Sequence, residues 1–276
     1  MNEYTYEPAK FFVPTLLITW VSWFGAAYFS HQAGMDSAMF PCMMLGSIAP
    51  AIIALYMVFG SRNRRLKKDF ISRLNILRIK PAYIPAIFLL MPASILLSIA
   101  VSLLFGHSAD QFRLSSEFGL MSAEAMLGLL ISVLAPTSEE FGWRGYGVDS
   151  LRSKFSLLKT SVVFVLLWAV WHVPLFFVKD SYQNELWQLG IPYVLNFFIS
   201  IIPLAFILNW VYYKSNRNIW AAVLFHIMAV VSAEAFSVLE STKFIQTAIL
   251  LIVTAGIMLY DRAFSAASSE PAPFGC

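Results

Sequence analysis

Five ionisable side chains stand within strongly apolar stretches of this sequence: Glu139, Glu140, Arg144, His172 and His226. A charge at the centre of a bilayer costs about 2.5–3.5 kcal/mol, so each of these groups needs a structural or chemical reason. Two carboxylates and two imidazoles around water suit hydrolysis. A carboxylate takes the proton from the water, one imidazole orients it, and a second imidazole donates to the oxyanion that forms.

The acidic pair is followed by an arginine at helical spacing. In a helix, Glu140 and Arg144 lie four residues apart on one face, in the order that favours an ion pair. Glu139 lies about 100° around the helix and is not neutralised by that contact. Because two adjacent carboxylates in low dielectric cannot both ionise cheaply, we expect Arg144 to hold Glu140 and Glu139 to remain as a general base. A buried ion pair that only joins two helices would explain the same pattern without chemistry.

The same side chains also suit a metal ion. Glu139, His172 and His226 could bind Zn²⁺ through one carboxylate and two imidazoles, leaving a fourth position for water. The helical H-E-x-x-H spacing of many zinc proteases is absent, and these three residues are far apart in the sequence. A metal-bound water and a glutamate-activated water therefore both remain open at this point.

Composition indicates where such a site must lie. The chain has 276 residues, of which 59% are hydrophobic and 13% charged, and its mean hydropathy is +0.69. An ordinary soluble domain carries about 25% charged residues, so this chain cannot cover a soluble globule with charge. Its apolar content excludes intrinsic disorder, and its two cysteines exclude a disulfide-stapled scaffold. A helical membrane protein is the class that remains.

Eight apolar segments are long enough to cross the lipid bilayer as helices, which takes about 20 residues each. We expect an all-α, polytopic membrane protein with one transmembrane domain over residues 1–262 and a flexible tail over 263–276. The predicted spans are approximately 11–29, 39–60, 82–105, 119–140, 160–178, 189–212, 219–237 and 244–260.

Lysine and arginine are concentrated in alternate loops, which orients the spans. Fifteen such residues lie on one side and three on the other, with Arg144 set aside. We therefore expect both termini in the cytoplasm, in a multi-pass protein of the cell (plasma) membrane. The basic segment 61–80 is interpreted as a topology signal beside anionic lipid headgroups. It lacks interleaved aromatic residues and any known binding module, so we expect no nucleic-acid partner.

The candidate residues are predicted to lie at similar depths. Counted from the cytoplasmic ends of their segments, His226, Glu140 and His172 lie about 12, 18 and 20 Å deep, at about 1.5 Å per helical residue. These depths predict a common polar cavity that opens toward the cytoplasm. Three glycines within residues 142–147 argue against an unbroken helix at that point.

The acidic motif resembles that of the CPBP family of intramembrane proteins. This family includes type II CAAX prenyl endopeptidases, bacteriocin-processing and self-immunity proteins, and abortive-infection proteins. Its members share the motifs E-E-x-x-x-R, F-x-x-x-H and H-x-x-x-N. The first is present as Glu139-Glu140-Phe-Gly-Trp-Arg144, followed by Gly145. The similarity extends over approximately residues 119–237, which are expected to form the CAAX-protease-like catalytic core.

The other two motifs depart from the family pattern at one position each. Trp168-x-x-x-His172 has tryptophan in place of phenylalanine, and Val173-Pro174 follows it. The third motif keeps His226, but Val230 stands where the family has asparagine. Loss of one hydrogen-bond donor to an oxyanion can cost about 10²–10³ in rate, so this departure leaves either a slow enzyme or a catalytically silent relative.

The resemblance implies a role for each candidate residue. Glu139 with His172 would activate the water, Glu140 and Arg144 would hold the site, and His226 would stabilise the oxyanion. Members of the family are widely described as metalloproteases, and a metal-free mechanism driven by glutamate is proposed for them as well. We favour the metal-free mechanism for this chain, with Zn²⁺ held by Glu139, His172 and His226 as the alternative.

These inferences lead to an intramembrane endopeptidase as the first hypothesis. It would cleave a lipidated or membrane-associated protein or peptide near the cytoplasmic leaflet. A catalytically silent membrane scaffold or immunity protein of the same family is the second hypothesis. A proton-coupled transporter is the third, because intramembrane glutamate and histidine form proton relays, although we find no inverted repeat in the sequence.

Overall fold

The computed structural model describes residues 4–115, 123–261 and 264. Across these residues the chain is almost wholly helical, and the β-structure found there is one isolated bridge between Leu114 and Phe236. The α-helices are α1 (Pro8–Ser30), α2 (Asp36–Gly60), α3 (Arg64–Arg73), α4 (Ile84–Ser102), α6 (Ala123–Gly142), α7 (Val148–Arg152), α8 (Leu157–His172), α9 (Tyr182–Leu189), α10 (Ile191–Lys214), α11 (Ile219–Ala235) and α12 (Thr242–Tyr260). The shorter elements are η1 (Ile76–Arg78), η2 (Pro81–Tyr83), η3 (Leu103–Phe105), η4 (Ala109–Phe112), η5 (Trp143–Gly147) and η6 (Val173–Phe177).

Each predicted span coincides with one helix of the bundle: α1, α2, α4, α6, α8, α10, α11 and α12. In the described chain, six helical stretches are long and apolar enough to cross a membrane, and α11 is a shorter apolar helix. A helix satisfies its own backbone hydrogen bonds, which lipid cannot do for it. The predicted all-α, polytopic membrane fold is therefore confirmed.

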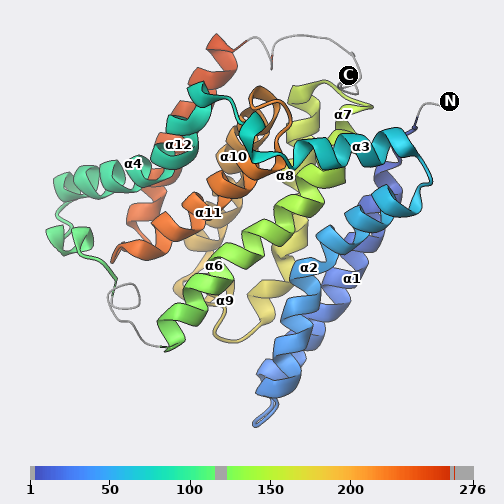
Figure 1. The fold of residues 1–276 in the computed structure, drawn as a ribbon. Coiled ribbons are helices and arrows are strands. Elements are labelled where there is room, and N and C mark those ends of the chain that lie inside the picture. Colours follow the sequence, from blue (N-terminus) through green and yellow to red (C-terminus); the bar gives the residue numbers. More distant parts are fainter. Residues whose placement is uncertain (1–3, 116–122, 262–263, 265–276) are drawn as a thin grey trace.

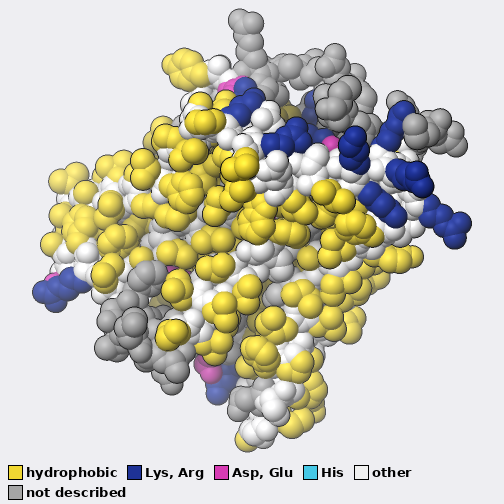
Figure 2. Space-filling view, viewed as in Figure 1, with side chains coloured by type: hydrophobic (Ala, Val, Ile, Leu, Met, Phe, Trp, Pro, Cys, Tyr) yellow, Lys and Arg dark blue, Asp and Glu magenta, His cyan; other side chains and the backbone are white. Residues whose placement is uncertain are grey.

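The outer faces of these helices are apolar. Figure 2 shows hydrophobic side chains over most of the visible surface, and outward-facing residues such as Val21, Leu17 and Ile252 are largely exposed. Large aromatic side chains fill the interior instead, among them Trp23, Trp143 and Trp168. Apolar surface on the outside of a membrane protein faces lipid, so the interior depends on close packing and on polar contacts between helices.

Helix α3 lies across one end of the bundle, which we call the α3 end (Figure 1). The side chain of Asn63 begins this helix by accepting hydrogen bonds from the amides of Arg65 and Leu66. Leu66 and Phe70 are buried on its inner face. Lysine and arginine side chains gather along its outer face in Figure 2, so the basic segment forms an amphipathic helix at the predicted cytoplasmic side.

The helix that carries the acidic motif does not stop at its glycines. It runs from α6 through η5, a single π-helical turn, into α7. A Cβ atom on Gly142 would overlap Cβ of Pro50, and one on Gly147 would lie 2.6 Å from a ring carbon of Phe11. The glycines therefore permit α1 and α2 to pack closely against this helix. The expected interruption is therefore limited to the α-helical winding, which the π turn replaces over residues 143–147, while the helical run itself continues.

The predicted tail, 263–276, lies outside the described residues except for Phe264. The ring of Phe264 stacks on that of Phe206 in α10, with the centroids 5.7 Å apart. Phe264 is itself buried. The chain therefore has at least one packing contact beyond the end of α12.

Candidate active site

Glu140 and Arg144 form a buried ion pair one turn apart at the end of α6. Nη1 of Arg144 lies 3.0 Å from Oε1 and 2.8 Å from Oε2 of Glu140, and neither side chain is exposed. The guanidinium also lies over the ring of Phe164, with its Cζ 4.8 Å from the ring centroid. The pairing predicted from the four-residue spacing is therefore present, within a continuous helical run.

His226 of α11 joins this pair from across the bundle. Its Nδ1 lies 2.9 Å from Oε1 of Glu140. A carboxylate accepts hydrogen bonds, so Nδ1 carries the hydrogen and the other ring nitrogen, Nε2, is left for other partners. Glu140 thus links Arg144 to the imidazole and fixes the direction in which that imidazole points.

Glu139 has different partners from Glu140. Its Oε2 accepts hydrogen bonds from the indole nitrogens of Trp143, at 3.3 Å, and Trp168, at 3.1 Å. Both donors are neutral, so these contacts orient the carboxylate without neutralising it. The expected division of the acidic pair is present in the geometry: one carboxylate is bound to arginine and the other is not.

Trp168 brings Glu139 and the two imidazoles around one ring. Its indole lies 5.6 Å from the ring centroid of His172 and 5.5 Å from that of His226. Nδ1 of His172 also lies 2.7 Å from the carbonyl oxygen of Trp168, and this carbonyl can only accept. Residues from α6, α8 and α11 therefore meet, as the sequence predicts; we call Glu139, Glu140, Arg144, His172 and His226 the acid–imidazole cluster.

Two polar residues that support this cluster were not identified from the sequence. Nη2 of Arg144 donates to Oδ1 of Asn209 at 3.0 Å, and Nδ2 of Asn209 donates to Oγ of Ser161 at 2.9 Å. All three side chains are buried. Asn209 is a polar residue inside the predicted span 189–212, and that intramembrane position was the signal that could have identified it.

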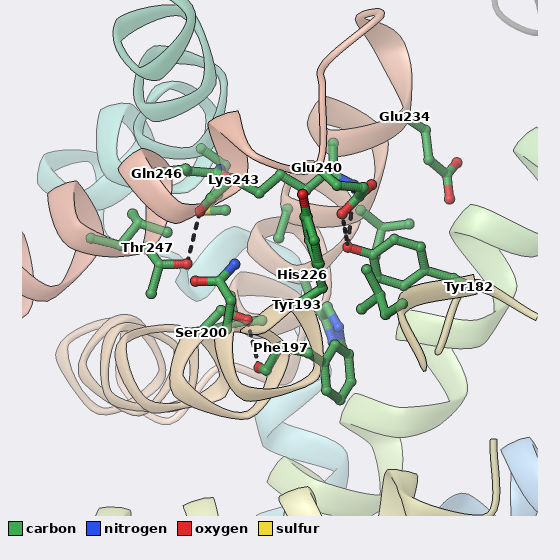
Figure 3. A pocket seen from close by; sticks show the side chains of 18 residues that line it. Tyr182, Tyr193, Phe197, Ser200, His226, Glu234, Glu240, Lys243, Gln246 and Thr247 are labelled. Carbon is green, nitrogen blue, oxygen red and sulfur yellow. Dashed lines mark hydrogen bonds and ion pairs between the residues drawn. The ribbon is translucent and has the colours of Figure 1, made fainter. Parts of the chain in front are cut away.

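A cavity of 330 Å³ reaches His226 from one side. It lies among α9, α10, α11 and α12, and Val230 and Glu234 line it beyond His226 (Figure 3). Lys243 and Glu240 form an ion pair on the same wall. Val230 presents an apolar side chain to this cavity, where the family motif would place an amide.

The cavity lies in the half of the bundle away from α3. Helix α11 starts beside the α3 end, where Nδ2 of Asn218 donates to the carbonyl oxygen of Asn75 at 2.7 Å. The cavity instead borders the later residues of α11 and the start of α12. The sequence predicts a cavity open toward the basic side; the cavity that the structure describes at His226 extends in the other direction.

Buried ion pairs fill the α3 end, which is the physical reason for this difference. Asp149 accepts from Arg73 at 3.0 Å, from Arg217 at 2.6 Å and from the hydroxyl of Tyr212 at 2.8 Å. Asp69 pairs with both arginines, at 2.9 Å in each case. We call these five residues the α3-end ion cluster.

Asp149 lies in α7, beyond the predicted span 119–140. Burial alone would raise the pKa of its carboxyl group, but the Arg217 and Arg73 guanidinium groups outweigh that effect. The pKa of Asp149 is therefore lowered from its ordinary value of 3.8. Both oxygens of this carboxylate accept hydrogen bonds from arginine or tyrosine side chains, so its role is structural.

The possible zinc ligands do not form a metal centre in the described structure. Within the described ranges, no three histidine, cysteine, aspartate or glutamate side chains lie close enough together to hold a metal ion. The arrangement of Glu139, His172 and His226 therefore does not fit a bound Zn²⁺, and no step below involves one.

Comparison with known proteins identifies the same part of the chain. Residues 121–232 match a family model described as Type II CAAX prenyl endopeptidase Rce1-like. This segment contains the whole acid–imidazole cluster. The chain is also 42% identical over 263 residues to CAAX prenyl protease 2 of Methanococcus maripaludis, a match that covers 95% of this chain and 97% of that protein.

Proposed function

We propose that this chain, which belongs to the type II CAAX prenyl endopeptidase Rce1-like family, is an intramembrane endopeptidase whose hydrolytic water is activated by Glu139 and His172. One observation carries the assignment of residues. The indole of Trp168 holds the carboxylate of Glu139 while both imidazoles pack against the same ring. A base and two imidazoles thereby surround one indole ring, and one of the imidazoles, His226, lines the cavity.

Glu139 is the general base in this proposal. The positive charge of Arg144 is directed at Glu140, so Glu139 keeps the basicity that proton abstraction requires. The two indole hydrogen bonds fix Oε2, which leaves Oε1 to accept a hydrogen bond from water. A positioned general base contributes about 10²–10⁴ in rate.

His172 orients the water. Because its Nδ1 donates to the Trp168 carbonyl, Nε2 of the neutral ring is an acceptor. A water held between Nε2 and the Glu139 carboxylate gives one hydrogen to each. The carboxylate then takes its proton as the oxygen attacks the peptide carbonyl.

His226 stabilises the oxyanion, and it does so in its protonated form. Its Nδ1 hydrogen points to Glu140, so Nε2 carries a second hydrogen only when the ring is an imidazolium. Glu140 stabilises that cation, while Arg144 and Asn209 keep Glu140 in place. The proton that Glu139 receives from water then passes to the leaving amine, which completes the hydrolysis.

The substrate in this proposal is a membrane-associated protein that carries a lipid. The curated relative is named a CAAX prenyl protease, and this chain shares 42% identity with it over almost its whole length. We propose that the scissile peptide enters the cavity that reaches His226. The side chains on the cavity walls are both apolar and polar, which suits an extended peptide next to a lipid chain.

The cleavage is proposed to take place nearer the cytoplasmic leaflet, so a peptide that enters through this cavity must reach His226 from the opposite half of the bundle. Support comes from the lysine and arginine side chains along α3, which mark the cytoplasmic side of membrane proteins. His226 lies about two turns after the start of α11, counted from the α3 end, at a depth of about 12 Å.

Thiol labelling of intact cells tests this orientation. The substitutions Lys68→Cys and Leu189→Cys are made separately, at two exposed positions, in a chain whose own Cys42 and Cys276 are replaced by serine. A reagent that does not cross the membrane should label the Leu189→Cys variant and leave the Lys68→Cys variant unlabelled. The reverse pattern would place α3 outside the cell and contradict the proposed side of cleavage.

A cleavage assay in liposomes tests the chemistry. The purified chain receives a synthetic peptide with a prenylated cysteine fourth from its C-terminus, and products are identified by mass. Wild type and the exposed control Glu185→Gln should release the C-terminal tripeptide, whereas Glu139→Gln should not. Equal cleavage by Glu139→Gln would contradict the assignment of the base, and no cleavage by wild type of prenylated or unprenylated peptide would contradict the proposed activity.

One observation favours a second candidate, the catalytically silent relative. Val230 lines the cavity one turn after His226, and its side chain offers no hydrogen-bond donor to an oxyanion. A silent scaffold requires the acid–imidazole cluster for stability alone. If the chain is such a scaffold, the Glu139→Gln variant should restore the wild-type phenotype when it is expressed in a strain that lacks the gene. If the chain is a protease as proposed, that variant should not restore it.

A further inference from the structure

Arg73 connects α3 to the backbone of the motif helix. It is a fully buried arginine, whereas Arg64, Arg65 and Lys68 on the same helix are exposed. Its Nη1 donates to the carbonyl oxygen of Arg144 at 2.7 Å, and its Nη2 donates to that of Gly145 at 3.0 Å. The hydroxyl of Tyr212 donates to the same Arg144 carbonyl at 3.0 Å.

These carbonyls belong to the π turn, η5, that interrupts the α-helical winding between α6 and α7. A π turn widens the helix and changes which carbonyls find partners within it. An arginine fork with two parallel donors matches two adjacent carbonyl oxygens. Phe70, one turn before Arg73 on α3, packs against the same turn, since a Cβ on Gly145 would lie 3.1 Å from its ring.

From this turn a series of short contacts leads to the reacting groups. Arg144 carries the carbonyl that Arg73 holds, and its side chain binds Glu140 at 2.8 Å. Glu140 in turn binds Nδ1 of His226 at 2.9 Å. The position of the η5 backbone therefore determines where the guanidinium, the carboxylate and the imidazole lie.

The geometry points to Arg73 as a positioning residue for the hydrolytic site: its guanidinium holds the π turn in the winding that directs Arg144 at Glu140 and, through Glu140, sets the position of His226. This role rests on the proposed function. Misplacement of a reacting group by about 1 Å can cost about 10²-fold in rate. A residue on a surface helix thereby acts on a site that it does not touch.

Arg217 provides the matched control. It is a second arginine of the α3-end ion cluster and pairs with Asp69 and Asp149, as Arg73 does. The contacts described for Arg217 are with those carboxylates, and the carbonyls of residues 144 and 145 are bound by Arg73. Arg217→Gln and Arg73→Gln therefore both remove a charge from the ion cluster. Only Arg73→Gln also removes the hydrogen bonds to the carbonyls of the π turn.

Two measurements on the full-length proteins in liposomes distinguish these roles. In peptide cleavage, Arg73→Gln should lower kcat by about 10²-fold with KM unchanged, since only positioning of the reacting groups is lost. In hydrogen–deuterium exchange, peptides that cover residues 143–150 should exchange faster in Arg73→Gln than in Arg217→Gln. Tyr212→Phe keeps every charge and removes the hydroxyl that contacts the Arg144 carbonyl, Asp149 and Arg73. It should show the same two changes to a smaller degree.

The inference is overturned if Arg217→Gln lowers kcat as much as Arg73→Gln, or if both keep the wild-type exchange at residues 143–150. If Arg73→Gln does not fold, Tyr212→Phe decides, and wild-type kcat and exchange in that variant overturn the inference. The exchange measurement does not depend on the protein's own proteolytic activity. A wild-type protein that cleaves nothing therefore rejects the proposed function, while the exchange comparison still decides whether Arg73 holds the turn.

Discussion

Asp149 and Glu139 are buried carboxylates ten residues apart on one helical run, and their surroundings are opposite in kind. Asp149 accepts hydrogen bonds from two guanidinium groups and from the hydroxyls of Tyr212 and Tyr213. Glu139 accepts from two neutral indoles. A carboxylate that is fully neutralised is a poor base, whereas one that is only oriented can still take a proton.

The two clusters also differ in access. Side chains of α3, α7 and α10 fill the α3 end around Asp149, while a cavity of 330 Å³ reaches His226. Burial of charge therefore does not by itself distinguish the proposed reactive site from the α3-end ion cluster. The distinguishing features are a carboxylate without a cationic partner in contact and an imidazole that faces open space.

Glu140→Gln should lower both the stability of the fold and the turnover, and its effect should be the largest of these substitutions. It leaves Arg144 buried without its counter-ion, and loss of one partner of a buried pair costs about 3–5 kcal/mol of unfolding free energy. Turnover per folded molecule should fall as well, because His226 loses the carboxylate that holds it. Thermal unfolding in detergent together with peptide cleavage checks both effects, with Glu185→Gln as control. An unchanged melting temperature would contradict this account of the pair.

Asp149→Asn should affect stability and leave more activity. Two buried arginines lose a counter-ion, but Asp69 still pairs with both, so we expect a loss of about 3 kcal/mol. Arg73 keeps its contacts with the carbonyls of the π turn. Turnover per folded molecule should therefore stay well above that of Glu140→Gln. A variant that unfolds like wild type would show that the ion cluster does not stabilise the fold.

Acidification should remove the part of the unfolding free energy that the Asp149 carboxylate contributes. The pKa of Asp149 is lower in the folded protein than in the unfolded chain, so the unfolded state binds its proton more readily. The contribution is complete above about pH 4 and is lost as the pH falls through the folded-state pKa. Melting temperatures measured from about pH 6 down to about pH 3 should therefore fall more steeply in wild type than in Asp149→Asn. Equal slopes for the two proteins would reject the assignment.

Val230→Asn should raise kcat at the proposed active site. It places an amide donor in the cavity one turn after His226, where an oxyanion would form. One such donor is worth about 10²–10³ in rate when ideally placed, and we expect a gain of about tenfold in kcat for an unrefined substitution. Val230→Leu serves as the apolar control. A gain in both variants, or in neither, would mean that the oxyanion lies elsewhere.

Much of the fold and of the site could be predicted from the sequence. The eight apolar segments each became a helix, because lipid leaves the backbone no alternative partner. The four-residue spacing of Glu140 and Arg144 predicted their ion pair for a local geometric reason. The five members of the acid–imidazole cluster were identified because charge inside an apolar segment is rare.

Features that depend on packing between helices escaped that reasoning. The inward orientation of Arg73 could not be predicted, since Arg73 is one of eight basic residues in the segment 61–80, which as a group indicate topology. Asn209 is one polar residue in a long apolar span, and its partner, Arg144, lies 65 positions away. The direction of the cavity depends on how side chains of α3, α7 and α10 fill one end of the bundle, which no local pattern records.

Isotope transfer from water tests the central claim most directly. Cleavage of the prenylated peptide in H₂¹⁸O should place one ¹⁸O atom in the new C-terminal carboxylate, at a rate that Glu139→Gln lowers by about 10²–10⁴ while its melting temperature stays that of wild type. Labelled product formed at the wild-type rate by folded Glu139→Gln would contradict the claim that this carboxylate activates the water.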